Sequence, residues 1–183
     1  PHDLKLAKQR GFTEKQEAAW MASYGPRNTE FTKKMEQMSS EEIVRWKYQR
    51  YLKDYLRCIR AVDENIGRLM KPLEDLDLSK ETIVIYSSDQ GFFLGEHGWF
   101  DKRFMYEECY RTPLIVRWPG VTEAGKVNDQ LVSNLDYAQT FLDLAGVEMD
   151  RPEVKAMQGI SMKPLLEGKE VPFRKSHYYQ YYE

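Results

Sequence analysis

The feature that most constrains the fold is an apolar run, Thr82-Ile83-Val84-Ile85-Tyr86, in which polar and apolar positions do not alternate. Such a run is typical of a strand in a sheet covered by helices on both faces, because both sides of the strand then need apolar residues. Residues 113–118 indicate a second strand, and residues 134–145 a helix with Gly146 at its C′ position. We therefore predict an α/β fold, a sandwich with a mostly parallel sheet flanked by helices.

Helical patterns dominate the chain before this run. Ser39 stands three residues before Glu42, which matches a capping box. Apolar residues then recur in steps of three and four, at Leu52, Tyr55, Leu56, Ile59, Val62, Ile66 and Leu69. This stripe predicts one long amphipathic helix over residues 39–71, laid on a core and ending before Pro72. Residues 1–38 are more polar and predict one or two short helices interrupted at Gly25-Pro26.

Composition excludes two classes of partner. The 27 basic and 29 acidic side chains of the 183 residues leave a net charge of -2, which gives no electrostatic case for binding nucleic acid. No apolar run approaches the roughly 20 residues of a membrane span. Cys58 and Cys109 lack metal-ligand spacing, so we predict two free thiols. Because the net charge is close to zero, an anionic substrate would be bound by a few individual basic side chains in the site.

The segment Ser87-Ser88-Asp89-Gln90-Gly91 follows the first predicted strand directly. In open α/β sheets the loops beyond the carboxyl ends of strands carry function. Asp89 and Gln90 offer neighbouring carboxylate and amide oxygens, the ligands that Ca²⁺ and Mg²⁺ prefer. Two adjacent ligands do not complete a coordination shell, so the others must come from elsewhere. The same residues also suit a plain turn, which Asp89 caps and Gly91 permits.

Two further side chains in the same loop could bind an anionic substrate or transfer a proton to it. His97, between Glu96 and Gly98, is a candidate proton donor or oxyanion ligand. Lys102 is a point charge suited to a sulfate or phosphate oxygen. Each also fits a plainer role, His97 as a solvated or turn-forming residue and Lys102 as a surface lysine. No single residue decides between these alternatives.

The run SDQGFFLGEHGWFDKR, followed by YEECYRTPLIVRWPG, closely resembles the second signature region of the sulfatase family. YLKDYLRCIRAVDENIGRLM upstream, and SNLDYAQTFLDLAGV and QGISMKPLLEG downstream, resemble further family segments in the same order. The resemblance covers residues 48–168. It implies a partial alkaline-phosphatase/sulfatase-like sandwich, with residues 1–168 as the C-terminal portion of a sulfatase catalytic domain. Residues 169–183 would begin a following C-terminal subdomain.

The resemblance also implies roles for particular residues. Asp89 and Gln90 match metal ligands, for Ca²⁺ or alternatively Mg²⁺. Lys102 matches a catalytic lysine that contacts the sulfate ester, and Arg103 follows it in the DKR form that resembles glucosamine-6-sulfatases. His97 lies in a GEHG element found in many members and is a second catalytic candidate. The implied substrate is a sulfated sugar or glycosaminoglycan fragment.

The family's nucleophile is not matched in this chain. Sulfatases attack sulfur with a formylglycine made from Cys or Ser in a C/S-x-P/A-x-R motif, and neither CIRAV at Cys58 nor CYRTP at Cys109 fits it. We therefore expect the nucleophile in an upstream N-terminal part of the same protein, and no activity from this segment alone. The family's habit implies a periplasmic, secreted or lysosomal location.

Three alternatives stay open at this point. A phosphodiesterase or phosphonate hydrolase of the same superfamily would share the sheet and a metal element at a strand end. Many such enzymes hold two zinc ions with several histidines, and this sequence offers only His2, His97 and His177. A degenerate, non-catalytic sulfatase paralogue would lack the upstream nucleophile motif. A stand-alone domain unrelated to sulfatases is the third alternative.

Overall fold

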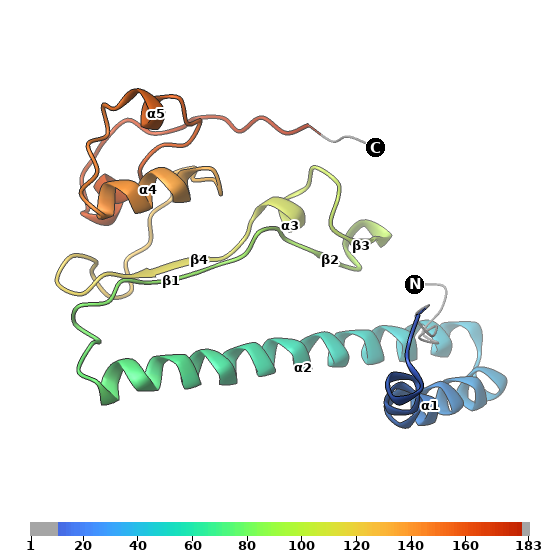
Figure 1. Ribbon diagram of the computed structural model, residues 1–183. Coiled ribbons are helices and arrows are strands. Elements are labelled where there is room, and N and C mark those ends of the chain that lie inside the picture. The colour runs from blue at the N-terminus through green and yellow to red at the C-terminus, as the bar shows by residue number, and fades with distance from the viewer. Residues whose placement is uncertain (1–10, 181–183) are drawn as a thin grey trace. The chain divides into compact units, whose positions relative to one another are not determined.

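A computed structural model describes residues 11–180 of the chain (Figure 1). The fold divides into two compact units, of which the first ends at Arg68 and the second begins at Leu69. The histidine candidate His2 lies outside the described residues. No helix among residues 11–180 combines the length and apolar character that crossing a bilayer requires.

The first unit is built around helix α1 (Glu14–Gln37) and most of helix α2 (Ser40–Asp75). The predicted interruption at Gly25-Pro26 is wrong, because α1 continues through Pro26. A capping box between Thr13 and Gln16 starts the helix, and buried Phe31 packs on Trp46 of α2 with ring centroids 5.6 Å apart. One proline removes one backbone hydrogen bond, and this cap and packing offset that loss.

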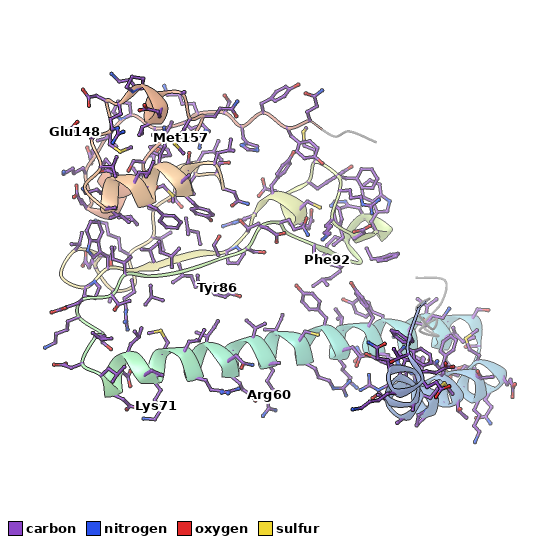
Figure 2. The ribbon with its side chains drawn as sticks, in the orientation of Figure 1. Arg60, Lys71, Tyr86, Phe92, Glu148 and Met157 are labelled. Carbon is purple, nitrogen blue, oxygen red and sulfur yellow. The ribbon has the colours of Figure 1, made fainter. Side chains whose placement is uncertain are left out.

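Helix α2 begins as predicted and ends later than predicted. The Ser39 amide donates to Glu42 Oε2 over 2.9 Å and the Glu42 amide to Ser39 Oγ over 3.3 Å, which confirms the capping box. Pro72 does not end the helix, since the Leu76 amide still donates to the Pro72 carbonyl over 3.0 Å. Arg60 and Lys71 project from α2 (Figure 2), and each pairs over 2.7 Å with an acid four residues on.

The apolar stripe of α2 is largely exposed among the described residues, so the prediction that it lies on a core stays a prediction. None of its residues is buried, and Leu56 and Leu69 are 58% and 73% exposed. Apolar surface of this extent is ordinarily covered.

In the second unit, strands β1 (Val84–Ser87) and β4 (Leu114–Arg117) confirm the two predicted strand positions. These two strands pair with each other in antiparallel register, with Val84 opposite Arg117 and Ser87 opposite Leu114. The connection between them, residues 88–113, contains a second strand pair and the 4-residue helix α3 (Glu107–Tyr110) and returns the chain beside β1. The sheet has two strands among the described residues, so the larger, mostly parallel sandwich stays a prediction.

The strand β1 is also less covered than predicted. Val84 and Ile85 are half-buried, and Tyr86, labelled in Figure 2, is 38% exposed. The antiparallel pairing places the carboxyl end of β1 beside the start of β4. The whole segment between them therefore leaves and returns at one end of the sheet.

That segment holds a second antiparallel pair, β2 (Phe93–Leu94) and β3 (Phe100–Asp101), joined through the 3₁₀ turn η1 (Glu96–Gly98). The remaining helices are α4 (Asp136–Leu144), α5 (Pro152–Lys155) and α6 (Lys163–Leu166). Helix α4 confirms the predicted helix, with Gly146 at a φ of 76° after its end. The buried side chains of this region are Asp136, Gln139, Thr140, Val154, Met162 and Leu165. They hold these three helices together.

Candidate functional site

The structure places Asp89 and Gln90 just beyond the carboxyl end of β1, as predicted. Their backbone is fixed from two sides, because Asn134 Nδ2 donates to the Asp89 carbonyl and Ser88 Oγ to the Gln90 carbonyl, each over 2.8 Å. The hydroxyl of Tyr137, in α4, hydrogen-bonds that of Ser87. Asp89 itself is exposed, and no described residue donates a hydrogen bond to its carboxylate. The oxygens of Asp89 therefore remain available to a ligand.

Gly91 brings the backbone of this loop into close contact with the backbone of α3. Its amide donates to the Cys109 carbonyl over 2.8 Å. A Cβ at this position would lie 1.9 Å from the Glu108 carbonyl oxygen and 2.9 Å from the carbonyl carbon of Cys109. Only glycine permits so close a backbone approach. Gly91 therefore sets the distance between the Asp89 loop and the helix that carries Glu108.

We expect Gly91→Ala to destabilise the full-length protein by about 1–3 kcal/mol or more, because the added methyl overlaps backbone atoms that must then move. The same displacement should lower metal affinity at Asp89. Gly67→Ala is the matched control, since a Cβ at Gly67, inside α2, meets nothing within 4 Å. That variant should be neutral or gain up to about 1 kcal/mol from helix propensity. Urea unfolding of both variants decides, and equal stabilities would contradict the close approach at Gly91.

His97 lies in the η1 turn and is oriented by a residue that the sequence did not single out. Its Nε2 lies 3.1 Å from Glu108 Oε1, and its ring is 4.5 Å from the Tyr106 ring and 6.0 Å from that of buried Phe93. Its φ of 57° belongs to the left-handed region, so His97 also forms the turn. The carboxylate and the rings together fix which way the imidazole faces.

Lys102 and Arg103 follow β3 directly, so the hairpin that carries His97 also carries both cations. Lys102 is exposed and forms no ion pair with any residue in the described range 11–180. Arg103 is held in place, because its Nε lies 3.5 Å from Asp101 Oδ2 and its carbonyl accepts from the Tyr179 hydroxyl. Among the described residues, therefore, Lys102 has no ion-pair partner, whereas its neighbour Arg103 is held by Asp101.

The two cysteines are free, as predicted, with Cys58 exposed and Cys109 half-buried. Burial raises the pKa of the Cys109 thiol, and the Phe104 backbone offsets this only in part. A raised pKa lowers the thiolate fraction at neutral pH. Cys109 is therefore a poor candidate for a nucleophile.

The residues that the structure describes do not by themselves form a complete metal centre. Within residues 11–180, no three His, Cys, Asp or Glu side chains come together as metal ligands. The exposed Asp89 carboxylate and the neighbouring Gln90 amide fit part of a shell for a hard cation such as Ca²⁺.

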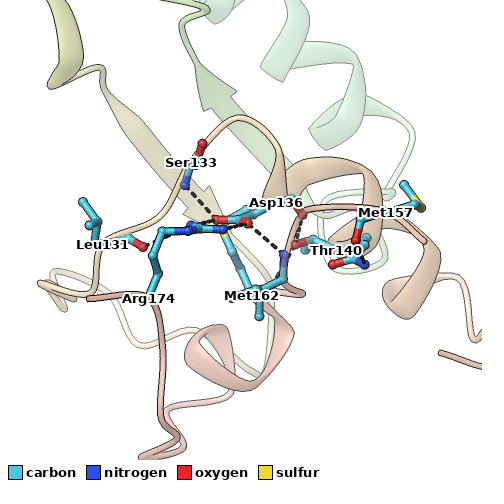
Figure 3. A network of polar contacts seen from close by, with 9 residues as sticks. Leu131, Ser133, Asp136, Thr140, Met157, Met162 and Arg174 are labelled. Atoms are coloured by element: carbon cyan, nitrogen blue, oxygen red, sulfur yellow. Dashed lines mark hydrogen bonds and ion pairs between the residues drawn. The ribbon is translucent and has the colours of Figure 1, made fainter. Parts of the chain in front are cut away.

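Figure 3 shows a buried ion pair between Asp136 and Arg174 within a network of polar contacts. Asp136, fully buried, accepts from both Arg174 nitrogens over 2.7 Å, from the Ser133 amide over 2.7 Å and from the Ile160 amide over 2.8 Å. Burial raises the pKa of Asp136, but the hydrogen bonds outweigh it, so the net pKa is lowered. The bond to Asp136 raises the pKa of Arg174.

This network positions Asp89 indirectly. The turn that Asp136 closes through the Ser133 amide contains Asn134, whose side chain holds the Asp89 carbonyl. Arg174 belongs to the segment 169–183, which we predicted to begin a further subdomain, and that assignment stays a prediction. Ser133 stands three residues before Asp136, a capping-box spacing that would have pointed to this turn.

Comparison with protein families identifies one match within the chain. Residues 95–183 match the C-terminal family model of N-sulphoglucosamine sulphohydrolase. This range includes His97, Lys102 and Arg103, whereas Asp89 and Gln90 precede it.

Two curated relatives are also sulfatases. The chain is 49% identical over 167 residues to an N-acetylglucosamine-6-O-sulfatase of Bacteroides thetaiotaomicron, a match that covers 90% of this chain and 29% of the relative. It is 35% identical over 109 residues to human N-acetylglucosamine-6-sulfatase, covering 59% of this chain and 19% of the relative. The chain thus spans less than a third of the length of these relatives.

Solved structures give two further matches. One, a protein in complex with its substrate D-glucosamine-2-N,6-O-disulfate, aligns with a TM-score of 0.78 and 47% identity over 94% of this chain and 34% of that one. The other, a phosphonate monoester hydrolase from Silicibacter pomeroyi, aligns with a TM-score of 0.54 and 32% identity over 60% of this chain and 21% of that one.

Proposed function

We propose that this chain is a C-terminal segment of a sulfatase and that the full-length protein removes sulfate from a sulfated carbohydrate, which the family match and the relatives support. The observation that carries this proposal is the exposed ammonium of Lys102, which has no ion pair with residues 11–180 and precedes Arg103 on the hairpin that also carries His97. The named activity of the relatives supports 6-sulfated glucosamine units of glycosaminoglycans as the substrate class. The proposed location, from the same relatives, is periplasmic, secreted or lysosomal.

Each of the three side chains has a separate role in this proposal. The Lys102 ammonium stabilises the negative charge that grows on the sulfate oxygens during attack, as a preorganised cation does most effectively. Arg103, braced by Asp101, binds a second polar group of the substrate. His97, held by Glu108, faces the leaving alcohol and exchanges a proton with it. The attacking group, a formylglycine, is expected upstream of this chain.

Asp89 and Gln90 would hold a metal ion, Ca²⁺ or alternatively Mg²⁺, together with ligands from the rest of the protein. Such an ion supplies positive charge next to the sulfate oxygens. The anchored backbone and the open carboxylate of Asp89 support this proposal, because a ligand loop must be held still while its oxygens stay accessible.

Asp89→Ala should weaken Ca²⁺ binding to the full-length protein by on the order of 10-fold or more, because it removes the charged ligand that this loop supplies. Asp89→Asn, which keeps an oxygen but loses the charge, should fall between this variant and the wild type. Asp150→Ala, at an exposed position outside the loop, is the control and should bind normally. Calorimetric titration with Ca²⁺ measures all three, and unchanged binding by Asp89→Ala would refute the assignment.

A second candidate function, phosphonate monoester hydrolysis, rests on the similarity to the Silicibacter pomeroyi structure. The two candidates differ in the ester that is cleaved. We expect kcat/KM of the full-length protein to favour 6-sulfated N-acetylglucosamine over a phosphonate monoester. The reverse preference would favour the second candidate, and cleavage of neither would indicate a non-catalytic paralogue.

A further inference from the structure

The C-terminal segment of the second unit, residues 173–180, is held at two distant points although it forms no helix or strand of its own. Near its start, Arg174 pairs over 2.7 Å with buried Asp136 of α4. Five residues later, the Tyr179 hydroxyl donates to the carbonyl of Arg103, which follows β3. The segment therefore joins the buried network of α4 to the hairpin that carries the candidate sulfate-binding cations.

Tyr179 is also packed against α3. Its ring lies 5.1 Å from the ring of Tyr110 at an angle of 89°, and the His177 ring lies 5.8 Å from that of Tyr110 at 75°. Such edge-to-face contacts are favourable and restrain the orientation of the rings. The adjacent Tyr178 is 80% exposed instead, and its hydroxyl donates to the Gln180 side chain over 3.1 Å. The half-buried Tyr179 ring is therefore held where its hydroxyl reaches the hairpin.

Helix α3 supports the other parts of the candidate site as well. Three consecutive residues of this helix each contact a different segment of the second unit. The contacts join Glu108 to His97, Cys109 to Gly91 of the Asp89 loop, and Tyr110 to Tyr179. Through Tyr179, the same short helix is connected to the backbone at Arg103.

The backbone before Arg103 needs such a restraint. Asp101, two residues earlier, has a φ of 96°, a conformation that residues other than glycine rarely adopt. Strained backbone of this kind persists where the surrounding contacts hold it. The ion pair between Arg103 and Asp101 spans 3.5 Å, and the Arg103 side chain is 52% exposed. Because an exposed pair of this kind restrains a side chain weakly, the backbone contact from Tyr179 is the firmer restraint.

We propose that Tyr179 is a positioning residue of the substrate site, whose hydroxyl fixes the Arg103 backbone so that the guanidinium is preorganised for a polar group of the sulfated sugar. This inference rests on the proposed function, in which Arg103 binds that group. Preorganisation of this kind increases affinity because less side-chain and loop freedom is lost on binding. The C-terminal segment therefore contributes to substrate binding although Tyr179 itself acts through Arg103.

The test is steady-state kinetics of the full-length protein on 6-sulfated N-acetylglucosamine. Tyr179→Phe should raise KM by roughly 3–10-fold, the scale of losing one hydrogen bond. kcat should not change, because Arg103 binds the substrate equally in the ground state and in the transition state. The phenylalanine ring keeps the packing on Tyr110, so the fold should be retained. Tyr178→Phe, which removes an exposed hydroxyl from the next residue, is the matched control and should have the wild-type KM.

A double variant tests whether Tyr179 acts through Arg103. If it does, Tyr179→Phe combined with Arg103→Ala should have the KM of Arg103→Ala alone, since the two changes affect one interaction. Multiplied increases in KM would overturn the inference. A wild-type KM in Tyr179→Phe, or a loss of kcat as large as the rise in KM, would overturn it as well.

Calorimetric titration with 6-sulfated N-acetylglucosamine separates this inference from the proposed function. Wild-type protein that binds this sugar without cleaving it would refute the proposed function alone. The same roughly 3–10-fold weakening in Tyr179→Phe, now measured as Kd, would then support the inference, and an unchanged Kd would overturn it. Wild-type protein that does not bind the sugar would overturn both.

Discussion

Replacing Lys102 by alanine in the full-length protein should lower kcat on 6-sulfated N-acetylglucosamine by about 10²–10³-fold, the scale of losing one preorganised donor. The ammonium of Lys102 has no carboxylate to neutralise it within the part of the chain that the structure describes, so its charge is available to the sulfate. For the same reason its removal should hardly change the free energy of unfolding.

Lys102→Arg should recover only part of the lost rate, because a planar guanidinium does not occupy the position of a compact ammonium. Lys80→Ala, which removes an exposed lysine outside the loop, is the matched control and should turn over like the wild type. Steady-state kinetics of the four proteins measure the effect. A Lys102→Ala enzyme with wild-type kcat would exclude contact between this ammonium and the reacting sulfate.

The largest effect on stability is expected at Asp136. Asp136→Asn should destabilise the full-length protein by about 3–5 kcal/mol, since it leaves the Arg174 guanidinium partly buried without its carboxylate. The variant also reduces the acceptors available to the Ser133 and Ile160 amides. Because the same turn holds Asn134, the variant should bind Ca²⁺ more weakly as well.

The control for Asp136 is an exposed ion pair. Glu64→Gln removes the partner of Arg60, both well exposed, and should cost less than about 1 kcal/mol. Urea unfolding of both variants gives the comparison, and a similar small loss in each would contradict a structural role for the buried pair.

The pair also predicts a pH dependence. The folded-state pKa of Asp136 is lowered, so its contribution to stability is present above the unfolded pKa of about 3.9 and is lost as pH falls through the folded value. In Asp136→Asn this part of the acid-induced loss should be absent. Unfolding free energies measured at several acidic pH values check the difference.

The sequence predicted those parts of the fold that local chemistry determines. The capping box at Ser39 and Glu42, the position of the strand after Thr82 and the glycine that follows α4 all depend on residues within a few positions of each other. Strand direction depends on the connection instead. The apolar run predicted a mostly parallel sheet, and it did not show that β4 would pair with β1 in antiparallel register.

In the candidate site, too, the sequence predicted some residues and not others. Asp89, His97 and Lys102 were visible as residue types in a loop after a strand. Their supports were not visible, because Glu108 lies 11 positions from His97, and Asn134 lies 45 positions from Asp89. Only the folded chain brings such partners together.

The most direct test of the central claim is release of inorganic sulfate from 6-sulfated N-acetylglucosamine, measured in parallel for the full-length protein and for residues 1–183. We expect release by the full-length protein and none by the segment, because the segment contributes Lys102, His97 and the Asp89 loop but not the attacking group. Release by the segment alone, or none by the full-length protein, would contradict this account.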